Sequence, residues 1–221
     1  MWTGHVPMDE LATLLELLHL ARGRFTSIEA RMQIRYDLRV LRNASRTGSP
    51  LGPAPDVTAG IQVAGRTDHV SFISNAKYRV QSESLGPRFL HIKDGERASM
   101  PDPVEISASG IYEQVAFMDA PALYRQVMWD PNMLIPEMWF EPLGRQIVAN
   151  REGLKVRARP RRTSHDYIVV PPWADAYEMV VDLERGVLLR FGCWFQGREG
   201  VADEVIEITF DRSLPEELFA V

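Results

Sequence analysis

The chain has 221 residues, of which 45% are hydrophobic, and a formal net charge of −5 at pH 7. This length and composition predict a single soluble globular domain over residues 1–221 with a sizeable buried core. The acidic balance argues against nucleic acid as a partner, because binding to phosphates depends on concentrated Lys and Arg. No apolar run is long enough for a membrane span, so the sequence predicts no transmembrane segment.

Residues 1–25 predict a helix and no secretion signal. They lack a basic start, and Asp9, Glu10 and Glu16 interrupt their apolar part, so we expect a cytoplasmic protein that keeps this segment. Leucines recur at helical spacing from Asp9 to about Ala21, which predicts a helix with one apolar face. The leucines that we expect to pack against the rest of the fold are Leu11, Leu15 and Leu18.

The clearest strand pattern is IEARMQIRYDLRV, residues 28–40, in which apolar and polar residues alternate. A strand of 13 residues at ~3.3 Å each would span about 43 Å, so it must curl. We expect Ile34, Tyr36 and Leu38 to be buried and Arg35 and Arg39 to be exposed. The arginines of this region could bind an anionic ligand, but the interleaved acids favour cross-strand ion pairs on a solvated face. These arginines are Arg31, Arg35, Arg39 and Arg42.

The rest of the chain predicts further strands interrupted by a helical insertion. Strands are expected around 61–64, 69–73, 78–82, 89–93 and 97–100, with Asp94-Gly95 as a hairpin turn. The insertion begins at Asp119 with two short helices, and the second helix begins at Asp130-Pro131. Strands then resume at 145–150, 154–160, 166–171, 177–182, 187–196 and 204–210. The predicted fold is therefore α+β and mainly β, a strongly curved antiparallel sheet covered by helices.

The search for catalytic motifs is negative. No phosphate loop, dinucleotide fingerprint or zinc pattern is present, so we expect no cofactor and no metal, and we identify no catalytic residues. The single Cys193 excludes an intramolecular disulfide and is expected to be a buried structural thiol. The run TSHDY, residues 163–167, favours a loop over a catalytic triad, because neighbours on a strand point to opposite faces. Glu137 and Glu141, one helical turn apart in the predicted insertion, are interpreted as solvated acids at a helix end.

The helical insertion, taken as residues 118–140, concentrates methionine and tryptophan. Soft Met side chains and broad aromatic faces suit a surface that repacks around variable apolar ligands. The alternative is that they fill the sheet as a solid core, as apolar helix faces usually do. The residues in question are Met118, Met128, Trp129, Met133, Met138, Trp139 and Phe140.

The stretch EMVVDLERGVLLRFGCWFQG, residues 178–197, followed by EVIEITFDRSLPEELF, resembles the closing strands of the LolA/LolB-like lipoprotein-carrier superfamily, which includes RseB-like and VioE-like proteins. The resemblance implies an open half-barrel lidded by helices, with an apolar cavity. It also implies that Leu189, Phe191, Cys193 and Phe195 face the concave side. Because no secretion signal or lipobox cysteine is found near the start, the superfamily's role in periplasmic lipoprotein transfer is not carried over.

The expected function is the binding or carriage of a hydrophobic small molecule or lipid in the concave face. Two alternatives remain open, namely a small cofactor-free enzyme of the same fold and a regulatory module with a protein partner. The residues expected to bind the ligand are Tyr36, Met128, Trp129, Met133, Met138, Trp139, Phe191 and Phe195.

Overall fold

The computed structural model describes residues 8–47, 65–74, 76–83, 90–95, 97–99, 123–161, 171 and 173–220. Its helices are α1 (Met8–Leu20), η1 (Ala21–Arg24), α2 (Leu38–Thr47), α5 (Leu123–Trp129), η2 (Pro131–Leu134) and η3 (Glu216–Phe219), where η marks a 3-10 helix. Its strands are β1 (Ile28–Tyr36), β2 (Gly65–Ser74), β3 (Lys77–Ser82), β4 (Leu90–Asp94), β5 (Arg97–Ser99), β6 (Met138–Val148), β7 (Arg151–Pro160), β8 (Ala176–Asp182), β9 (Leu188–Phe195) and β10 (Arg198–Phe210).

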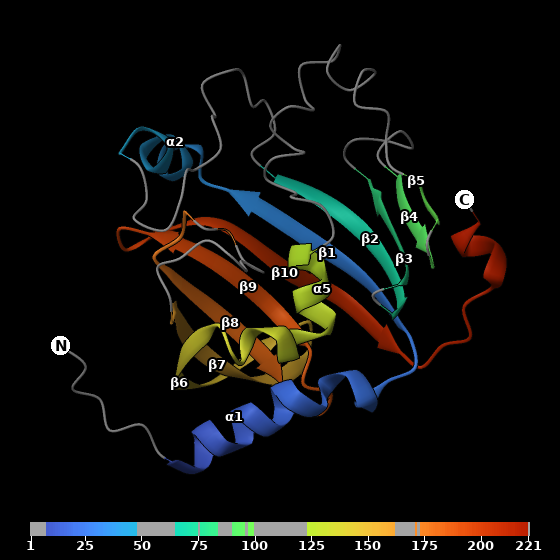
Figure 1. The fold of residues 1–221 in the computed structure, drawn as a ribbon, viewed down its shortest axis with the longest axis horizontal. Helices are drawn as coiled ribbons and strands as arrows, with labels where there is room; N and C mark the ends of the chain where they lie inside the picture. Colours follow the sequence, from blue (N-terminus) through green and yellow to red (C-terminus); the bar gives the residue numbers. More distant parts are fainter. Residues whose placement is uncertain are drawn as a thin grey trace.

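The ten strands form one antiparallel sheet in the order β5-β4-β3-β2-β1-β10-β9-β8-β7-β6. Figure 1 shows the sheet curving around α5, with α1 running along its lower end. A bulge between Arg31 and Met32 interrupts the register of β1 with β10, and bulges increase local twist. The predicted curved antiparallel sheet, open between β5 and β6, is confirmed among the strands that the structure describes.

The outer face of β1 carries the ion pairs expected from the sequence. Arg31 bonds Glu83 at 3.0 Å, and Arg35 bonds Glu204 at 2.8 Å. The hydrogen bond from Arg31 lowers the pKa of the Glu83 carboxyl. The structural interpretation of these two arginines is therefore confirmed, whereas the side chain of Arg42 lies outside the described part.

The N-terminal helix is confirmed, with a shift in which leucines are buried. The helix α1 contacts β6, β8 and η2. Leu14 and Leu18 are fully buried and Leu17 nearly so, whereas Leu11 and Leu15 are only partly buried against the core. Among the described residues, no helix has the length and apolar character needed to cross a bilayer.

The turn between β8 and β9 is built around Asp182, a fully buried carboxylate. Asp182 Oδ1 accepts hydrogen bonds from the backbone N–H groups of Glu184 at 2.9 Å and Arg185 at 2.6 Å, and Arg151 pairs with the same carboxylate. The turn closes when Gly186 N–H donates to Asp182 O at 2.9 Å. The predicted hairpin is thus confirmed, and its turn is stabilised by a compensated buried charge.

The prediction of one strand over residues 28–40 is wrong at its end. β1 ends at Tyr36, and Asp37 caps α2 by accepting hydrogen bonds from the backbone N–H of Arg39 at 2.9 Å and Val40 at 3.2 Å. The alternation continues through Val40, but the hydrogen bonds of Asp37 stabilise the start of a helix instead. Arg35 and Arg39 are exposed and Ile34 is buried, as expected, while Tyr36 and Leu38 are only partly buried.

The prediction that the helical insertion reaches Phe140 is also wrong. Residues from Met138 onward form β6, which pairs with β7 from Met138↔Pro160 to Val148↔Arg151. The strand pattern of β6 is interrupted in the sequence by Pro142 and by a bulge between Pro142 and Gly144. Gly144 has φ of 114°. Glu137 and Glu141 therefore do not lie one helical turn apart.

The other predicted elements match the described ranges closely. β2, β3, β4 and β5 lie at the expected positions, and Asp94 pairs with Arg97 around Gly95, which has φ of 60°. The second predicted helix is the short η2, with Pro131 in its first turn. The predicted strand at 61–64, the helix start at Asp119, Met118 and the run 163–167 lie outside the described residues.

Gly186 and Gly197 offer a test of how α1 docks on the sheet. Both have φ of 76°, so alanine costs roughly 1–2 kcal/mol of left-handed strain at either position. A Cβ at Gly186 would overlap the carbonyl oxygen of Leu17 in α1, whereas a Cβ at Gly197 would meet nothing within 4 Å. We expect Gly186→Ala to lower the free energy of unfolding by several kcal/mol more than Gly197→Ala in urea denaturation. Equal losses would show that α1 does not pack on this turn.

Candidate functional site

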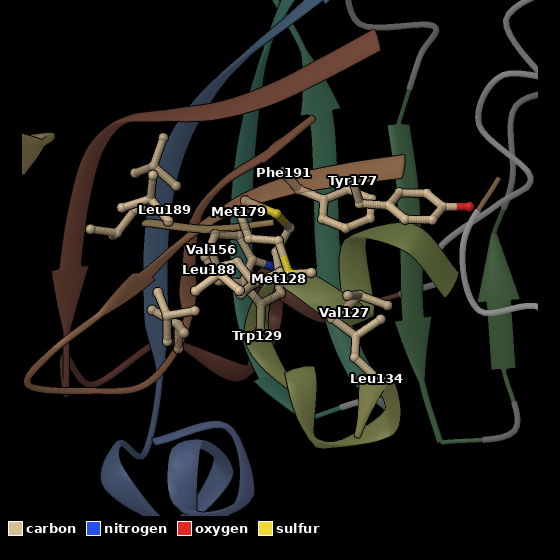
Figure 2. Packing of buried hydrophobic residues seen from close by; sticks show 14 of the residues in the cluster. Val127, Met128, Trp129, Leu134, Val156, Tyr177, Met179, Leu188, Leu189 and Phe191 are labelled. Carbon is tan, nitrogen blue, oxygen red and sulfur yellow. The ribbon is translucent and has the colours of Figure 1, made fainter. Parts of the chain in front are cut away.

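An apolar layer covers the concave side of β6–β9 beneath α1, α5 and η2, which together are called the helical cover below. Val156 lies opposite Met179, which lies opposite Phe191 across three neighbouring strands. The rings of Tyr177 and Phe191 stack with centroids 5.6 Å apart. Figure 2 shows Met128 and the neighbouring Trp129 reaching from α5 toward these strands. The layer and the cover therefore share one apolar cluster.

Seven of the eight residues expected to bind a ligand belong to this cluster or pack against it. Five are exposed by 3% or less, and two are partly buried at its margin. The buried residues are Met128, Trp129, Met138, Phe191 and Phe195, and the partly buried residues are Tyr36 and Met133. Leu189 and Cys193, expected on the concave side, are also buried.

Trp139 is the exception, and its expected place under the cover is corrected. Its side chain is 57% exposed, and the guanidinium of Arg161 lies 4.4 Å from its ring centroid. The reason is that residues 138–140 form a strand and not the predicted helix. Successive side chains of a strand point to opposite faces, so Trp139 lies on the opposite face from its buried neighbours Met138 and Phe140.

Trp129 carries a polar group into the apolar cluster. The side chain is 1% exposed, and within the described part of the chain its indole Nε1 has no hydrogen-bond acceptor. An indole N–H is only a donor, so it requires an oxygen or another acceptor nearby. The arrangement suits an apolar molecule that carries a neutral oxygen. A buried carboxylate is disfavoured, since Arg66 is the one buried Lys or Arg among the described residues and Asp68 compensates it.

A buried ion pair between Arg66 and Asp68 was missed in the sequence. The two side chains lie on β2, each 1% exposed and 3.1 Å apart. They are opposite Ile34 and Met32 of β1, so they share the inner face with Val70, two residues further along β2. The alternation R-x-D-x-V in residues 66–70 would have found them, but the predicted strand began only at His69. One buried ion pair thus interrupts an inner face that is otherwise mostly apolar on β1–β3.

A pocket lies at the rim, between the first turns of α2 and the turn that joins β9 to β10. It has a volume of about 420 Å³ and is called the rim pocket below. Val40 and Phe195 provide its buried apolar surface, and the side-chain amides of Asn43 and Gln196 bond each other at 3.1 Å. The remaining lining residues are Arg39 and Arg198.

The outer face holds another concavity, of about 530 Å³, beside Trp194. Its lining includes Arg157 and Glu178, which bond each other at 3.0 Å, and Asp175, which accepts a hydrogen bond from the backbone of Gln196 at 2.8 Å. Arg159 also lines it. Acids and bases are thus balanced in this outer concavity, in contrast to the rim pocket. No group of three or more potential metal ligands occurs in the described ranges.

Cys193 lies within the apolar layer and is 2% exposed. Burial raises the pKa of its thiol well above the ordinary value, and the carboxylates of Asp203 and Glu199 raise it further. Because the thiolate is the reactive form, the folded protein keeps this residue unreactive.

We expect Cys193 in the folded protein to react with a thiol reagent at about pH 8 roughly a hundredfold or more slowly than in urea, because reaction requires opening of the cover. The measurement is the absorbance of the chromophore that the reagent releases when it reacts with the thiol, followed over time. As pH rises past the ordinary thiol pKa, the unfolded state loses its proton first, so stability should fall at alkaline pH. A fast reaction in the folded state would contradict the buried position.

No protein-family model matches the chain, and a comparison with curated proteins found no match. Solved structures do match. MucB in complex with MucA(peri) aligns with a TM-score of 0.51 at 12% identity, over 95% of this chain and 59% of the MucB chain. An uncharacterised conserved protein from Thermus thermophilus aligns at 0.47 with 12% identity, over 95% and 92%. A LolA superfamily protein from Nitrosomonas europaea aligns at 0.33 with 11% identity, over 95% and 97%.

The chain thus spans 59% of the length of the MucB chain that it matches. At 12% identity the likeness establishes the fold, and function is argued from the residues of this chain. The fold expected from the resemblance to the LolA/LolB-like superfamily is confirmed: this protein is an open antiparallel half-barrel with a helical cover.

Proposed function

We propose that this protein binds a hydrophobic molecule of the lipid class between the concave face of its sheet and the helical cover. The proposal is supported by the gathering of Met128, Met133 and Met138 in or beside one cluster that also holds nine buried aromatic residues. Flexible Met side chains repack around apolar molecules of different shapes. The proposal is also supported by the half-barrel fold, in which the concave side of β6–β9 presents an apolar surface to the cover.

Two elements of the helical cover, α5 and η2, are short enough for a ligand to take their place. α5 has 7 residues and η2 has 4, and isolated helices shorter than about 12 residues are marginal in water. Their position therefore depends on side-chain contacts with the sheet. An acyl chain that makes the same contacts can displace them without exposing the apolar layer to water.

The observation that carries the proposal is the indole of Trp129. A buried donor without an acceptor costs about 1–3 kcal/mol, and native structures rarely leave such a group without a reason. An ester or hydroxyl oxygen of a lipid would accept this hydrogen bond, and its hydrocarbon chain would pack on Met128 and Met179. The ligand that fits is therefore apolar and carries a neutral oxygen.

Trp129→Phe keeps an aromatic ring in the cover and removes the donor. We expect the wild-type protein to bind monolauroylglycerol, a neutral acyl ester, with saturable quenching of tryptophan emission. Trp129→Phe should weaken that binding by about tenfold, as the loss of one buried hydrogen bond predicts. Binding of diphenylhexatriene, a hydrocarbon fluorophore without an acceptor, should change little.

The matched control is Tyr177→Phe in the same cluster. Its hydroxyl already donates to Pro171 O at 2.7 Å, so its removal should lower the free energy of unfolding by about 0.5–1.5 kcal/mol. It should leave the affinity for monolauroylglycerol unchanged. Absence of saturable binding of either probe to the wild-type protein would overturn the proposal and leave a solid core as the explanation of the cluster.

A protein-interaction role is the second candidate, and the exposed apolar side chains of β6 favour it. Trp139, Leu143 and Ile147 of this edge strand are 57%, 40% and 74% exposed. Exposed apolar side chains grouped on one strand are typical of a contact surface. MucB was crystallised in complex with MucA(peri), which supports a protein partner for a protein of this fold.

The second candidate is tested by a photo-crosslinker placed at Ile147 in the native host. A discrete crosslinked product is expected there, because an apolar partner surface would lie against this side chain. The control position is Arg212, whose side chain is 65% exposed at the end of β10. Equal or no crosslinking at the two positions would contradict a partner at β6.

A further inference from the structure

The rim pocket differs in charge from the remainder of the inner side. Two of its six lining residues are Arg39 and Arg198, and no Asp or Glu is among the six. Within the described residues neither guanidinium forms an ion pair. The neighbouring carboxylates of Asp37 and Asp175 hydrogen-bond backbone N–H groups and not these guanidinium groups. Two guanidinium groups beside one pocket repel each other and attract an oxyanion.

The rim pocket is continuous with the apolar cluster. Phe195 and Val40 line the pocket, and both are buried members of the cluster that holds Trp129. Phe195 lies opposite Arg198 in the ladder of β9 with β10, so the cation and the apolar ring share one face of the sheet. Phe191 lies on the same face, about 13 Å further along β9. The rim pocket therefore places guanidinium groups beside an aromatic ring of the apolar cluster.

We propose that the rim pocket binds the phosphate head group of a lipid whose acyl chain lies under the helical cover. This inference rests on the proposed function and specifies its ligand as an anionic amphiphile. Arginine forms two parallel hydrogen bonds to phosphate oxygens, and the amides of Asn43 and Gln196 can donate further bonds. The acyl chain would continue from Phe195 into the apolar cluster, so the charge stays at the solvated rim.

The test compares monolauroylglycerol with monolauroylglycerol phosphate, which has the same acyl ester and an added phosphate. The phosphate lipid should bind the wild-type protein at least about tenfold more tightly, because charge-assisted hydrogen bonds are the stronger kind. Arg39→Gln and Arg198→Gln should each remove most of that preference and leave the affinity for the neutral lipid unchanged. Lysine at either position should restore part of the preference, and added salt should reduce it.

The matched control is Arg159→Gln. Arg159 is also exposed, lines the outer concavity and forms no ion pair with the described residues, so the change in net charge is the same. Its substitution should leave both affinities unchanged. An equal loss with Arg159→Gln would overturn the inference, because the preference would then come from general charge.

The remaining outcomes separate the inference from the proposed function. Equal binding of the two lipids to the wild-type protein would overturn the head-group site and leave the proposed function intact. Failure of both lipids to bind would overturn both. A third measurement uses inorganic phosphate as a competitor. If free phosphate binds as tightly as the phosphate lipid does, the pocket is a site for the free anion, and the head-group assignment is overturned.

Discussion

Burial of the concave face of the sheet is the interaction on which the rest of this structure depends. A single curved sheet cannot cover its own apolar face, and each large side chain left in water would cost about 1.5–3 kcal/mol. Over β6–β9 the face is covered by α1 and by two helices too short to be stable alone. The contacts that hold the cover closed are therefore the same contacts that a hydrophobic ligand would use. Stability and access to the interior are linked through one set of side chains.

The two halves of the sheet handle burial differently. Around β8 and β9 the inner face is apolar, and Phe191 and Met179 pack directly under the cover. On β2 the inner face carries the Arg66–Asp68 pair, each side chain 1% exposed. Removing one partner of such a pair is costly, while the intact pair adds little net stability. Its effect is to place one buried charge pair on β2 in an inner face that is otherwise mostly apolar.

Local patterns predicted most of the fold, and the failures have physical causes. The hairpin around Gly186 was predictable because its turn chemistry is local. The end of β1 was not, since Asp37 continues an alternating pattern while its side chain caps a helix. β6 was hidden by Pro142, a residue that strands tolerate at an edge, and an edge position is a property of the whole sheet.

The candidate site was predictable only in its apolar part. Met128 and Trp129 stood out because methionine and tryptophan are concentrated in one stretch of the chain. Trp139 was misplaced with them, because side-chain direction follows from strand or helix and not from composition. The rim pocket could not be found from the sequence, since Arg39 and Arg198 are far apart in the chain and meet only through the pairing of β1 with β10.

The irregularity of β6 has a consequence for the behaviour of the protein at high concentration. A long edge strand with exposed Leu143 and Ile147 would ordinarily recruit the edge of another molecule and extend into fibrils. Pro142 has no N–H to donate, and Gly144 bends the backbone through a left-handed bulge in the middle of the strand. A second strand therefore cannot add a continuous ladder there. The bulge lets the protein keep an apolar outer edge while it blocks growth of the sheet from one molecule to the next.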